Sequence, residues 1–263
     1  MRTARGALSA EEREAAAAEI DGPGTEEKDW RTARLPDRLP HLDLPEGPVV
    51  VVAAHPDDEV LGFGGTMAAL VGAGISVHTI CLTDGEASHG DGDGDGDAPA
   101  RDTLAALRRR ELAAALDELG PLHAPLHTGI PDTALDRHED VATAAIAGLL
   151  SETGARLCLA PWDGDLHSDH EAAGRAARRA CRATGTTMWS FPVWMWHWAR
   201  PDDPRVPWRR AGVLPLTPVA LGRKKAALAR FTSQLEARGP GVPPVLPPEE
   251  LAHHIRTFET VIR

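Results

Sequence analysis

The feature that most constrains this chain is an unbroken apolar run from Pro48 to Ala54, which is rich in β-branched valine. A short run of this kind, without polar alternation, is typical of a strand buried on both faces of a parallel sheet. Similar strand-like runs span residues 75–83 and 156–160. Helix-like patterns follow these runs at 64–73, 104–119, 141–150 and 171–183. Strands that alternate with helices predict an α/β fold: a doubly wound, mostly parallel, Rossmann-like sheet with helices on both faces.

The two ends of the chain are less regular. Residues 1–47 are predicted to form an N-terminal extension, with a helix near 9–20 and a proline-punctuated extended stretch from 35 to 48. Residues 48–263 are predicted to form the main domain. In its later part we expect a short strand, a tryptophan-rich strand, a surface loop and two helices, at 122–128, 187–198, 199–222, 223–235 and 247–262 respectively.

Composition excludes several classes of protein. The formal net charge of −11 argues against nucleic acid as a partner, because nucleic-acid binders need a basic face. No apolar run approaches the ~20 residues that a membrane span requires, and the N-terminus turns charged at once. The three cysteines are odd in number and widely spaced, which favours free thiols in a reducing cytoplasm. We therefore expect a cytoplasmic protein without a membrane or nucleic-acid partner. Its oligomeric state is left open.

Polar residues follow the first buried strand as His55-Pro-Asp-Asp-Glu59. In open α/β sheets, ligands bind beyond the carboxyl ends of the strands, so this motif stands where the fold places a site. Carboxylates held close together repel one another and shift each other's pKa unless a cation compensates. Histidine nitrogen and aspartate oxygen suit zinc and tolerate other divalent first-row ions. A solvated turn is the alternative for this motif taken alone.

A second polar motif, Asp165-Leu-His167-Ser-Asp169-His170, follows the strand-like run 156–160. Two histidines three residues apart lie near one face of a helix that begins around Asp169. Two histidine-bearing clusters at the carboxyl ends of two strands favour a shared metal site over two unrelated turns.

The combination of Ala54-His-Pro-Asp-Asp-Glu59 with His167-Ser-Asp-His170 resembles the LmbE-like, PIG-L family of zinc-dependent N-acetylglucosamine deacetylases. The family includes sugar deacetylases of the mycothiol and bacillithiol pathways and tailoring deacetylases of glycopeptide antibiotics. Weaker matching marks are Thr83–Ser88, Arg108–Glu111, Ile130–Asp132 and Ser233-Gln234. The resemblance covers residues 48 to about 235, which implies an LmbE-like deacetylase domain within 48–263.

The resemblance implies a role for each matching residue. His55, Asp58 and His170 would hold one Zn²⁺ per chain. Asp57 would be the general base, and His167 would polarise the carbonyl or help the leaving amine. Asp169 would orient a histidine, while Arg108 and Asp132 match positions that contact the sugar. Three protein ligands leave a fourth zinc position open, which is the pattern of a catalytic site.

The chain also departs from its relatives. It contains no tyrosine, and some relatives place a tyrosine two residues before the first histidine of the second motif, where this chain has Asp165. Phe231 stands where many relatives carry histidine or tyrosine. Help for the oxyanion is therefore assigned to the metal and, if protonated, to His167.

Three further features have competing interpretations. Gly62-Phe-Gly-Gly65 does not fit the dinucleotide-binding pattern and favours close packing of a helix on the sheet. The acidic run Asp91–Asp97 nearly matches a calcium loop, but a solvated loop at the mouth of the site is favoured. Trp194, Trp196 and Trp198 alternate along the expected strand, where they are either core residues or a platform for a sugar.

Three hypotheses about function follow. The first is removal of the acetyl group from a small-molecule N-acetyl amino sugar or glycoside, in a thiol pathway or in antibiotic biosynthesis. The second is a zinc amidase that acts on another acyl amide. The third is a non-catalytic module that binds sugar or metal on the same fold. Asp57 argues against the third, because a binding protein has no need for a base beside an open metal.

Overall fold

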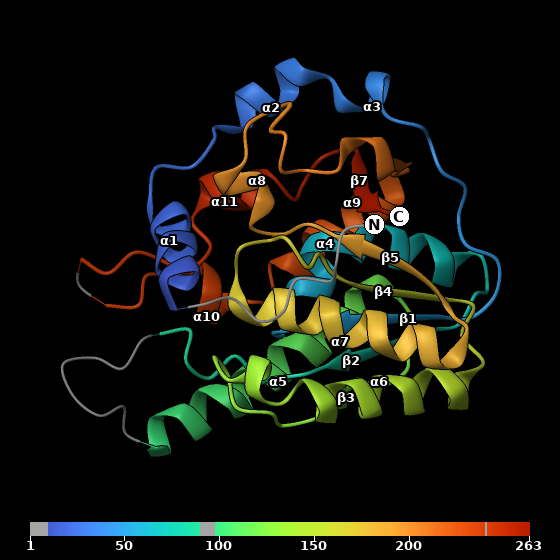
Figure 1. Cartoon of the computed structure of the whole chain (residues 1–263), viewed down its shortest axis with the longest axis horizontal. Helices are drawn as coiled ribbons and strands as arrows, with labels where there is room; N and C mark the ends of the chain where they lie inside the picture. The colour runs from blue at the N-terminus through green and yellow to red at the C-terminus, as the bar shows by residue number, and fades with distance from the viewer. Residues whose placement is uncertain (1–9, 90–97, 240) are drawn as a thin grey trace.

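The computed structural model describes residues 10–89, 98–239 and 241–263. Within these ranges a single seven-stranded sheet runs in the order β3-β2-β1-β4-β5-β7-β6 (Figure 1). Its strands are β1 Val49–Ala53, β2 Val77–Cys81, β3 Leu126–His127, β4 Leu157–Pro161, β5 Thr187–Phe191, β6 Ala211–Pro215 and β7 Phe258–Ile262. The strands from β3 to β5 are parallel, and β7 is antiparallel to both β5 and β6. The predicted doubly wound, mostly parallel α/β sheet is confirmed.

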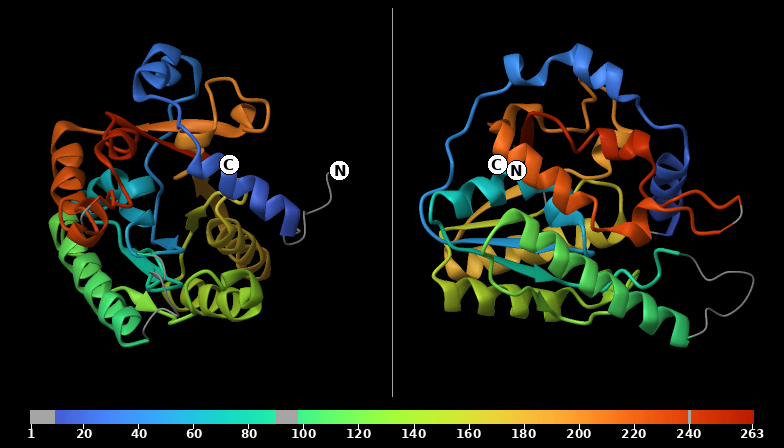
Figure 2. Two further views of the ribbon diagram at one scale, coloured as in Figure 1. Left: turned by 90° about the vertical axis from the view of Figure 1, so that its left-hand side faces the viewer. Right: turned by 180° about the vertical axis from the view of Figure 1, so that it is seen from behind.

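Helices cover both faces of the sheet, as Figures 1 and 2 show. On one face α4 Asp58–Gly72, α5 Ala98–Leu119 and α9 Pro218–Leu228 pack together, and on the other α6 Glu139–Thr153 packs on α7 Ser168–Thr184. Side chains alternate between the faces of a strand. Val49 and Val51 of β1 therefore join the core beneath α4 and α5, while Val50 and Val52 join the core beneath α6 and α7. This two-sided burial explains the unbroken apolar run.

The expected tryptophan-rich strand at 187–198 is wrong in its second half. Strand β5 ends at Phe191, Pro192 follows, and Met195–Trp198 form the short helix α8. The cause is a side chain from elsewhere in the chain: the buried carboxylate of Asp165 accepts hydrogen bonds from the backbone N–H groups of Val193, Trp194 and Met195, at 2.8–3.3 Å. These bonds turn the chain away from the sheet, so the tryptophans do not alternate on a strand.

The C-terminal part also differs from expectation. The expected loop at 199–222 contains the 3₁₀ turn Trp208–Arg210, strand β6 and the start of α9, and the expected helix at 223–235 is divided between α9 and α10 Thr232–Leu235. The expected helix at 247–262 is only α11 Pro248–Ala252, and strand β7 follows it. Strand β7 is inserted between β5 and β6, and β6 is a short apolar segment that lies beside it. Both strands depend on pairing partners distant in sequence, which local patterns do not reveal.

Residues 10–47 form an N-terminal arm over the edge of the sheet that carries β6 and β7 (Figure 1). The expected helix near 9–20 is α1 Ala10–Asp21, and two short helices follow, α2 Glu27–Ala33 and α3 Leu35–Arg38. Trp30 is 2% exposed and donates its Nε1–H to the Trp196 carbonyl at 2.8 Å. Its ring meets the Trp196 ring edge-on, with centroids 5.0 Å apart. The arm therefore shares a hydrophobic core with α8.

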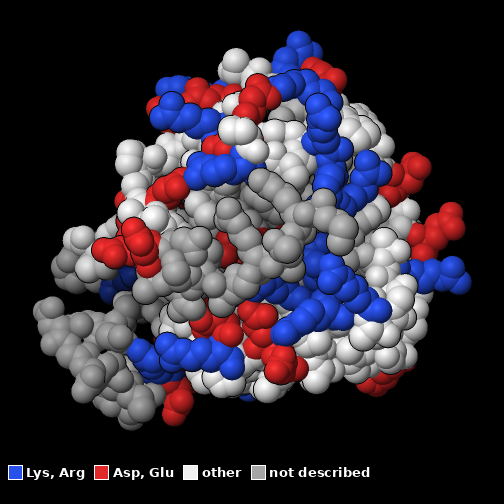
Figure 3. Space-filling model, viewed as in Figure 1, with Lys and Arg blue, Asp and Glu red and all other residues white. Residues whose placement is uncertain are grey.

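Charged side chains of both signs intermix on the face seen in Figure 3. On α7, Arg175 pairs with Glu139 at 2.6 Å, Arg178 with Asp163 at 2.8 Å, and Arg179 with Asp140 at 3.1 Å. Much of the positive charge of this helix is therefore paired. No helix in the described part of the chain has both the length and the apolar character that a membrane span requires.

Candidate metal centre and active site

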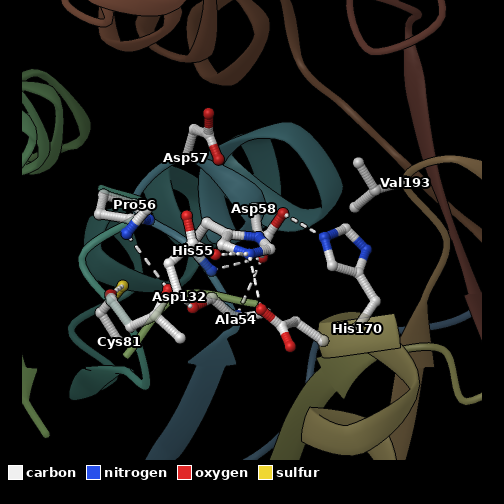
Figure 4. A network of polar contacts seen from close by, with 12 residues as sticks. Ala54, His55, Pro56, Asp57, Asp58, Cys81, Asp132, His170 and Val193 are labelled. Carbon is white, nitrogen blue, oxygen red and sulfur yellow. Dashed lines mark hydrogen bonds and ion pairs between the residues drawn. The ribbon is translucent and has the colours of Figure 1, made fainter. Parts of the chain in front are cut away.

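The two polar motifs meet at the carboxyl ends of β1 and β4, as expected for this fold (Figure 4). His55 follows β1, and Asp58 is the first residue of α4. His167, Asp169 and His170 stand at the start of α7, shortly after β4. The fold therefore brings together residues that are more than 100 positions apart in the chain.

Asp58 lies between two histidines. Its Oδ1 is 3.2 Å from His170 Nε2, and its Oδ2 is 3.7 Å from His55 Nδ1. The backbone N–H groups of Ala54 and His55 both donate to Asp58 Oδ2 at 2.9 Å, which fixes the orientation of the carboxylate. The three residues implied as metal ligands are thus in contact, and their donor atoms face one another.

The far nitrogen of each of these two histidines meets a buried carboxylate. His170 Nδ1 is 2.8 Å from Asp165 Oδ2. His55 Nε2 is 3.1 Å from Asp132 Oδ1 and 3.4 Å from Asp169 Oδ2. Metal-binding histidines characteristically hold a carboxylate or carbonyl on the nitrogen that does not bind the metal. Both His55 and His170 have this arrangement.

The third histidine, His167, is different. Its ring lies 4.5 Å from that of His170 and 5.0 Å from that of His55, and it stacks on Trp194 at 6.4 Å. Its Nδ1 is buried and has no hydrogen-bond partner among the described residues. Burial, together with the neighbouring charges of His170 and His55, lowers the pKa of His167 to about 3. The ring is therefore neutral near pH 7, so the charged form considered from the sequence is disfavoured.

The electrostatics of the cluster favour a bound cation. Burial lowers the pKa of His170, but Asp58 and Asp165 outweigh it and raise that pKa to about 9. Burial likewise lowers the pKa of His55, yet Asp132, Asp169 and Asp58 raise it well above its usual range. Both shifts report the same excess of buried negative charge, which a divalent cation would compensate. Ligand-capable atoms lie within 4.8 Å of one another in two groups: His55 with His167 and His170, and His55 with Asp132 and Asp169.

Asp57 has a strained backbone, and its carboxylate is bound by Arg108 and not by a histidine of the cluster. Its φ of +147° lies in a region that non-glycine residues rarely adopt, and strain of this kind concentrates at functional sites. Arg108 donates from Nη2 to Asp57 Oδ2 at 3.0 Å. Burial raises the pKa of Asp57 to about 6, although Arg108 opposes the shift. The Asp57 carboxylate is therefore held beside the cluster by an arginine and not by the histidines.

A cavity of about 230 Å³ opens onto the cluster. Its polar lining includes His55, Asp57, Asp58, Arg108, Asp132, His167 and His170. Arg108 is 2% exposed and also donates to the Gly85 and Pro56 carbonyls, while Asp132 accepts from the Ala87 N–H at 2.9 Å. Seven of the eight residues singled out from the sequence thus line this cavity. Asp169 does not line the cavity, but its carboxylate contacts His55 Nε2 at 3.4 Å.

Sequence reasoning missed several contributors. Asp165 belongs to the second motif but receives no role from the sequence, whereas in the structure it is fully buried and supports His170. The signal was its place in the second motif, five residues before His170. Leu61, Val193, Gln234, Val245 and Leu246 also line the cavity. Trp194 lines it as well, whereas Trp196 and Trp198 are buried in the core with Trp30. The acidic run Asp91–Asp97 lies outside the described residues.

Residues 50–181, about half of the chain, match the family described as PIG-L: GlcNAc-PI de-N-acetylase. The chain belongs to the PIG-L family. It is 30% identical over 185 residues to a 1D-myo-inositol 2-acetamido-2-deoxy-alpha-D-glucopyranoside deacetylase of Rhodococcus opacus, which covers 63% of this chain and 59% of the relative. It is 33% identical over 135 residues to a probable N-acetyl-alpha-D-glucosaminyl L-malate deacetylase 2 of Bacillus cereus, which covers 50% of this chain and 60% of the relative.

The chain thus spans about 60% of the length of these curated relatives. Among solved structures, the zinc-inhibited form of teicoplanin deacetylase Orf2 superposes with a TM-score of 0.58 at 19% identity, over 71% of this chain and 84% of that one. At this identity the similarity supports the fold and carries no conclusion about chemistry.

Proposed function

We propose that this protein is a metal-dependent deacetylase that removes the acetyl group from an N-acetylated amino sugar. The observation that carries the proposal is Asp58 lying between His55 and His170, with the base Asp57 beside them in one cavity. Two curated relatives are named as deacetylases of N-acetylglucosaminyl compounds, which supports the same substrate class.

The proposed metal ligands are His55, Asp58 and His170. The buried carboxylates on the far nitrogens of both histidines fit this set. The alternative set replaces Asp58 with His167, but His167 Nδ1 lacks any such support among the described residues. Mixed nitrogen and oxygen donors suit zinc, although other divalent first-row ions are compatible. Such an ion, when bound, polarises an amide carbonyl and makes a nearby water more acidic.

The proposed general base is Asp57. Its pKa of about 6 leaves it mostly ionised at pH 7 and still able to accept a proton from water. Arg108 fixes the direction of the carboxylate through Oδ2, which leaves Oδ1 to meet the water. Contacts of Arg108 and Asp132 with the sugar remain predictions, and their place in the lining supports them.

His167 is proposed to act as a neutral hydrogen-bond donor to the carbonyl oxygen, while the leaving amine takes up the proton that Asp57 accepted from water. Its low pKa favours the neutral ring, and one ring nitrogen of neutral imidazole still carries a proton. Asp169 is proposed to position His55, since its Oδ2 lies 3.4 Å from His55 Nε2 while its two oxygens accept from Thr133 N–H and Leu135 N–H.

We also propose that residues 48–263 form the deacetylase domain and residues 1–47 an N-terminal extension, of which the described part, 10–47, packs on the domain. A cytoplasmic location and the absence of a nucleic-acid partner stay predictions.

Metal analysis combined with acetate release tests the proposal. Zinc-loaded protein is mixed with N-acetylglucosamine, its methyl glycoside and N-acetylated amino acids. Acetate from the sugars, abolished by chelation and restored by zinc, is the expected result. Acetate from the amino acids alone would identify an amidase of another class. Sugar binding without acetate release would mean a non-catalytic module.

A further inference from the structure

We propose that the cavity binds a glycoside whose aglycone is apolar, and not one that carries an anionic or polyol aglycone. This inference rests on the proposed function and concerns the part of the substrate beyond the N-acetyl sugar. It follows from an apolar wall that the metal cluster does not use.

The wall comes from two segments that are far apart in the chain. Val193 and Trp194 follow β5, and Val245 and Leu246 precede α11. Figure 4 shows Val193 beside the His170 ring, across the cluster from Pro56. The Trp194 ring is nearly parallel to that of His167, with an interplanar angle of 12°. The apolar wall is therefore next to His167, on one side of the polar cluster.

Hydrogen bonds hold both segments in place. Asp165 accepts from the N–H groups of Val193 and Trp194, so the carboxylate that supports His170 also positions the wall. Leu246 N–H donates to the Gln234 carbonyl at 2.9 Å, and Arg238 Nε donates to the Pro243 carbonyl at 2.8 Å. A wall fixed in this way presents apolar area without a large cost in conformational entropy on binding.

The charges of the lining disfavour an anionic aglycone. Asp57, Asp58 and Asp132 are carboxylates of the lining, and Arg108 is the only lysine or arginine among the described lining residues. Arg108 already binds Asp57 and the carbonyls of Pro56 and Gly85. Apart from the groups assigned to the metal, the described lining therefore offers no lysine or arginine that is free to pair with a carboxylate on the aglycone.

A polyol aglycone is disfavoured for a different reason. Hydroxyl groups placed against Val193, Trp194, Val245 and Leu246 would lose water and gain few hydrogen bonds, which is unfavourable for each group left without a partner. An alkyl or aryl aglycone gains from the same contact, because it removes apolar surface from water.

Four N-acetyl-α-glucosaminides that differ only in aglycone test the inference: methyl, hexyl, inositol and L-malate. With zinc-loaded protein we expect kcat/KM to be highest for the hexyl glycoside and lowest for the malate glycoside. Dissociation constants measured by calorimetry on D57N should run in the opposite direction, lowest for the hexyl glycoside and highest for the malate glycoside. A higher kcat/KM for the malate or inositol glycoside than for the hexyl glycoside would overturn the inference alone. No acetate from any of the four would overturn the proposed function and this inference with it.

Two pairs of variants locate the effect. V245K places a cation in the wall, and V242K places the same cation on an exposed position of the same segment, 41% exposed and outside the lining. We expect V245K to raise the malate-to-hexyl ratio of kcat/KM at least about tenfold and V242K to leave it unchanged.

The second pair removes a tryptophan. W194A should lower the hexyl-to-methyl ratio of kcat/KM by about tenfold, whereas W208A, which removes a half-buried tryptophan outside the lining, should not. Equal ratios within either pair would contradict the assignment of the wall.

Discussion

The parallel part of the sheet, β3 to β5, contrasts with its antiparallel edge, β7 and β6. The parallel part supplies the polar cluster, and residues 50–181, which match the PIG-L family, contain His55, Asp57, Asp58, His167 and His170. The apolar wall of the cavity lies outside that matched range, at residues 193–194 and 245–246. The residues assigned to chemistry thus lie in the region shared with the family, whereas the proposed aglycone surface lies in the region that the family match does not cover.

The antiparallel edge of the sheet contains a pair of buried charged residues, Lys224 and Glu259. Lys224 Nζ contacts Glu259 Oε1 at 2.6 Å and donates to the Leu61 carbonyl at 2.8 Å. Glu259 also accepts from the N–H groups of Gly65 and Thr66. These bonds tie β7 and α9 to α4, the helix that begins with Asp58. The two regions are therefore coupled through α4.

The largest effect is expected from D57N in the parallel part. Asparagine preserves shape but cannot accept the proton, so kcat for acetate release should fall about 10²–10⁴-fold while zinc content is unchanged. D117N, on the exposed face of α5, is the control and should behave as wild type. Loss of zinc together with activity would place Asp57 among the metal ligands.

The second effect concerns the edge and the N-terminal arm. W30A removes a ring that is 2% exposed and should lower the free energy of unfolding by about 3–5 kcal/mol, measured by denaturant titration. Its zinc content should remain that of wild type, because in the part of the chain that the structure describes Trp30 packs in another core, away from the polar cluster. W208A should cost much less stability, because Trp208 is only half-buried. An unchanged free energy of unfolding for W30A would mean that the arm is a dispensable appendage.

A smaller effect is expected from D165N, where the two regions meet. The neutral side chain weakens the support of His170 Nδ1, so zinc affinity in a chelator competition should fall about 10–100-fold. D163N, two residues earlier, loses only the contact with Arg178 and serves as the matched control. If D165N and D163N bind zinc equally well, the proposed support of His170 is wrong.

The smallest effect is a pH dependence of stability that arises in the arm. Burial raises the pKa of Glu27, but hydrogen bonds from His253 and Arg256 outweigh it and lower that pKa from 4.5 to about 2. A lowered pKa in the folded state stabilises the protein above about pH 4.5, and this contribution is lost as the pH falls toward 2. E27Q should therefore flatten the fall of the unfolding free energy across this window. An identical pH profile for E27Q and wild type would exclude Glu27 as the source.

The parallel part of the sheet and the meeting of the two polar motifs could be predicted from local patterns in the sequence. Strands β1 and β4 are continuous apolar runs, and a polar motif follows each of them closely in the chain, so local patterns and one fold rule predict that the two motifs meet. The roles of the single residues in these motifs come from the resemblance to the PIG-L family. These signals are short-range, since each motif lies within about ten residues of its strand.

The antiparallel edge, the N-terminal arm and the apolar wall could not be predicted in this way, because they form through tertiary contacts. Strands β6 and β7 depend on pairing with partners far away in the chain, helix α8 forms where Asp165 binds three backbone N–H groups, and Trp30 is buried by Trp196, 166 positions later. The burial of Asp165, and hence its support of His170, likewise depends on residues 193–195 folding over it. Each of these outcomes depends on a contact between distant residues that leaves no periodic trace in the sequence, and tertiary contacts of this kind override local propensity.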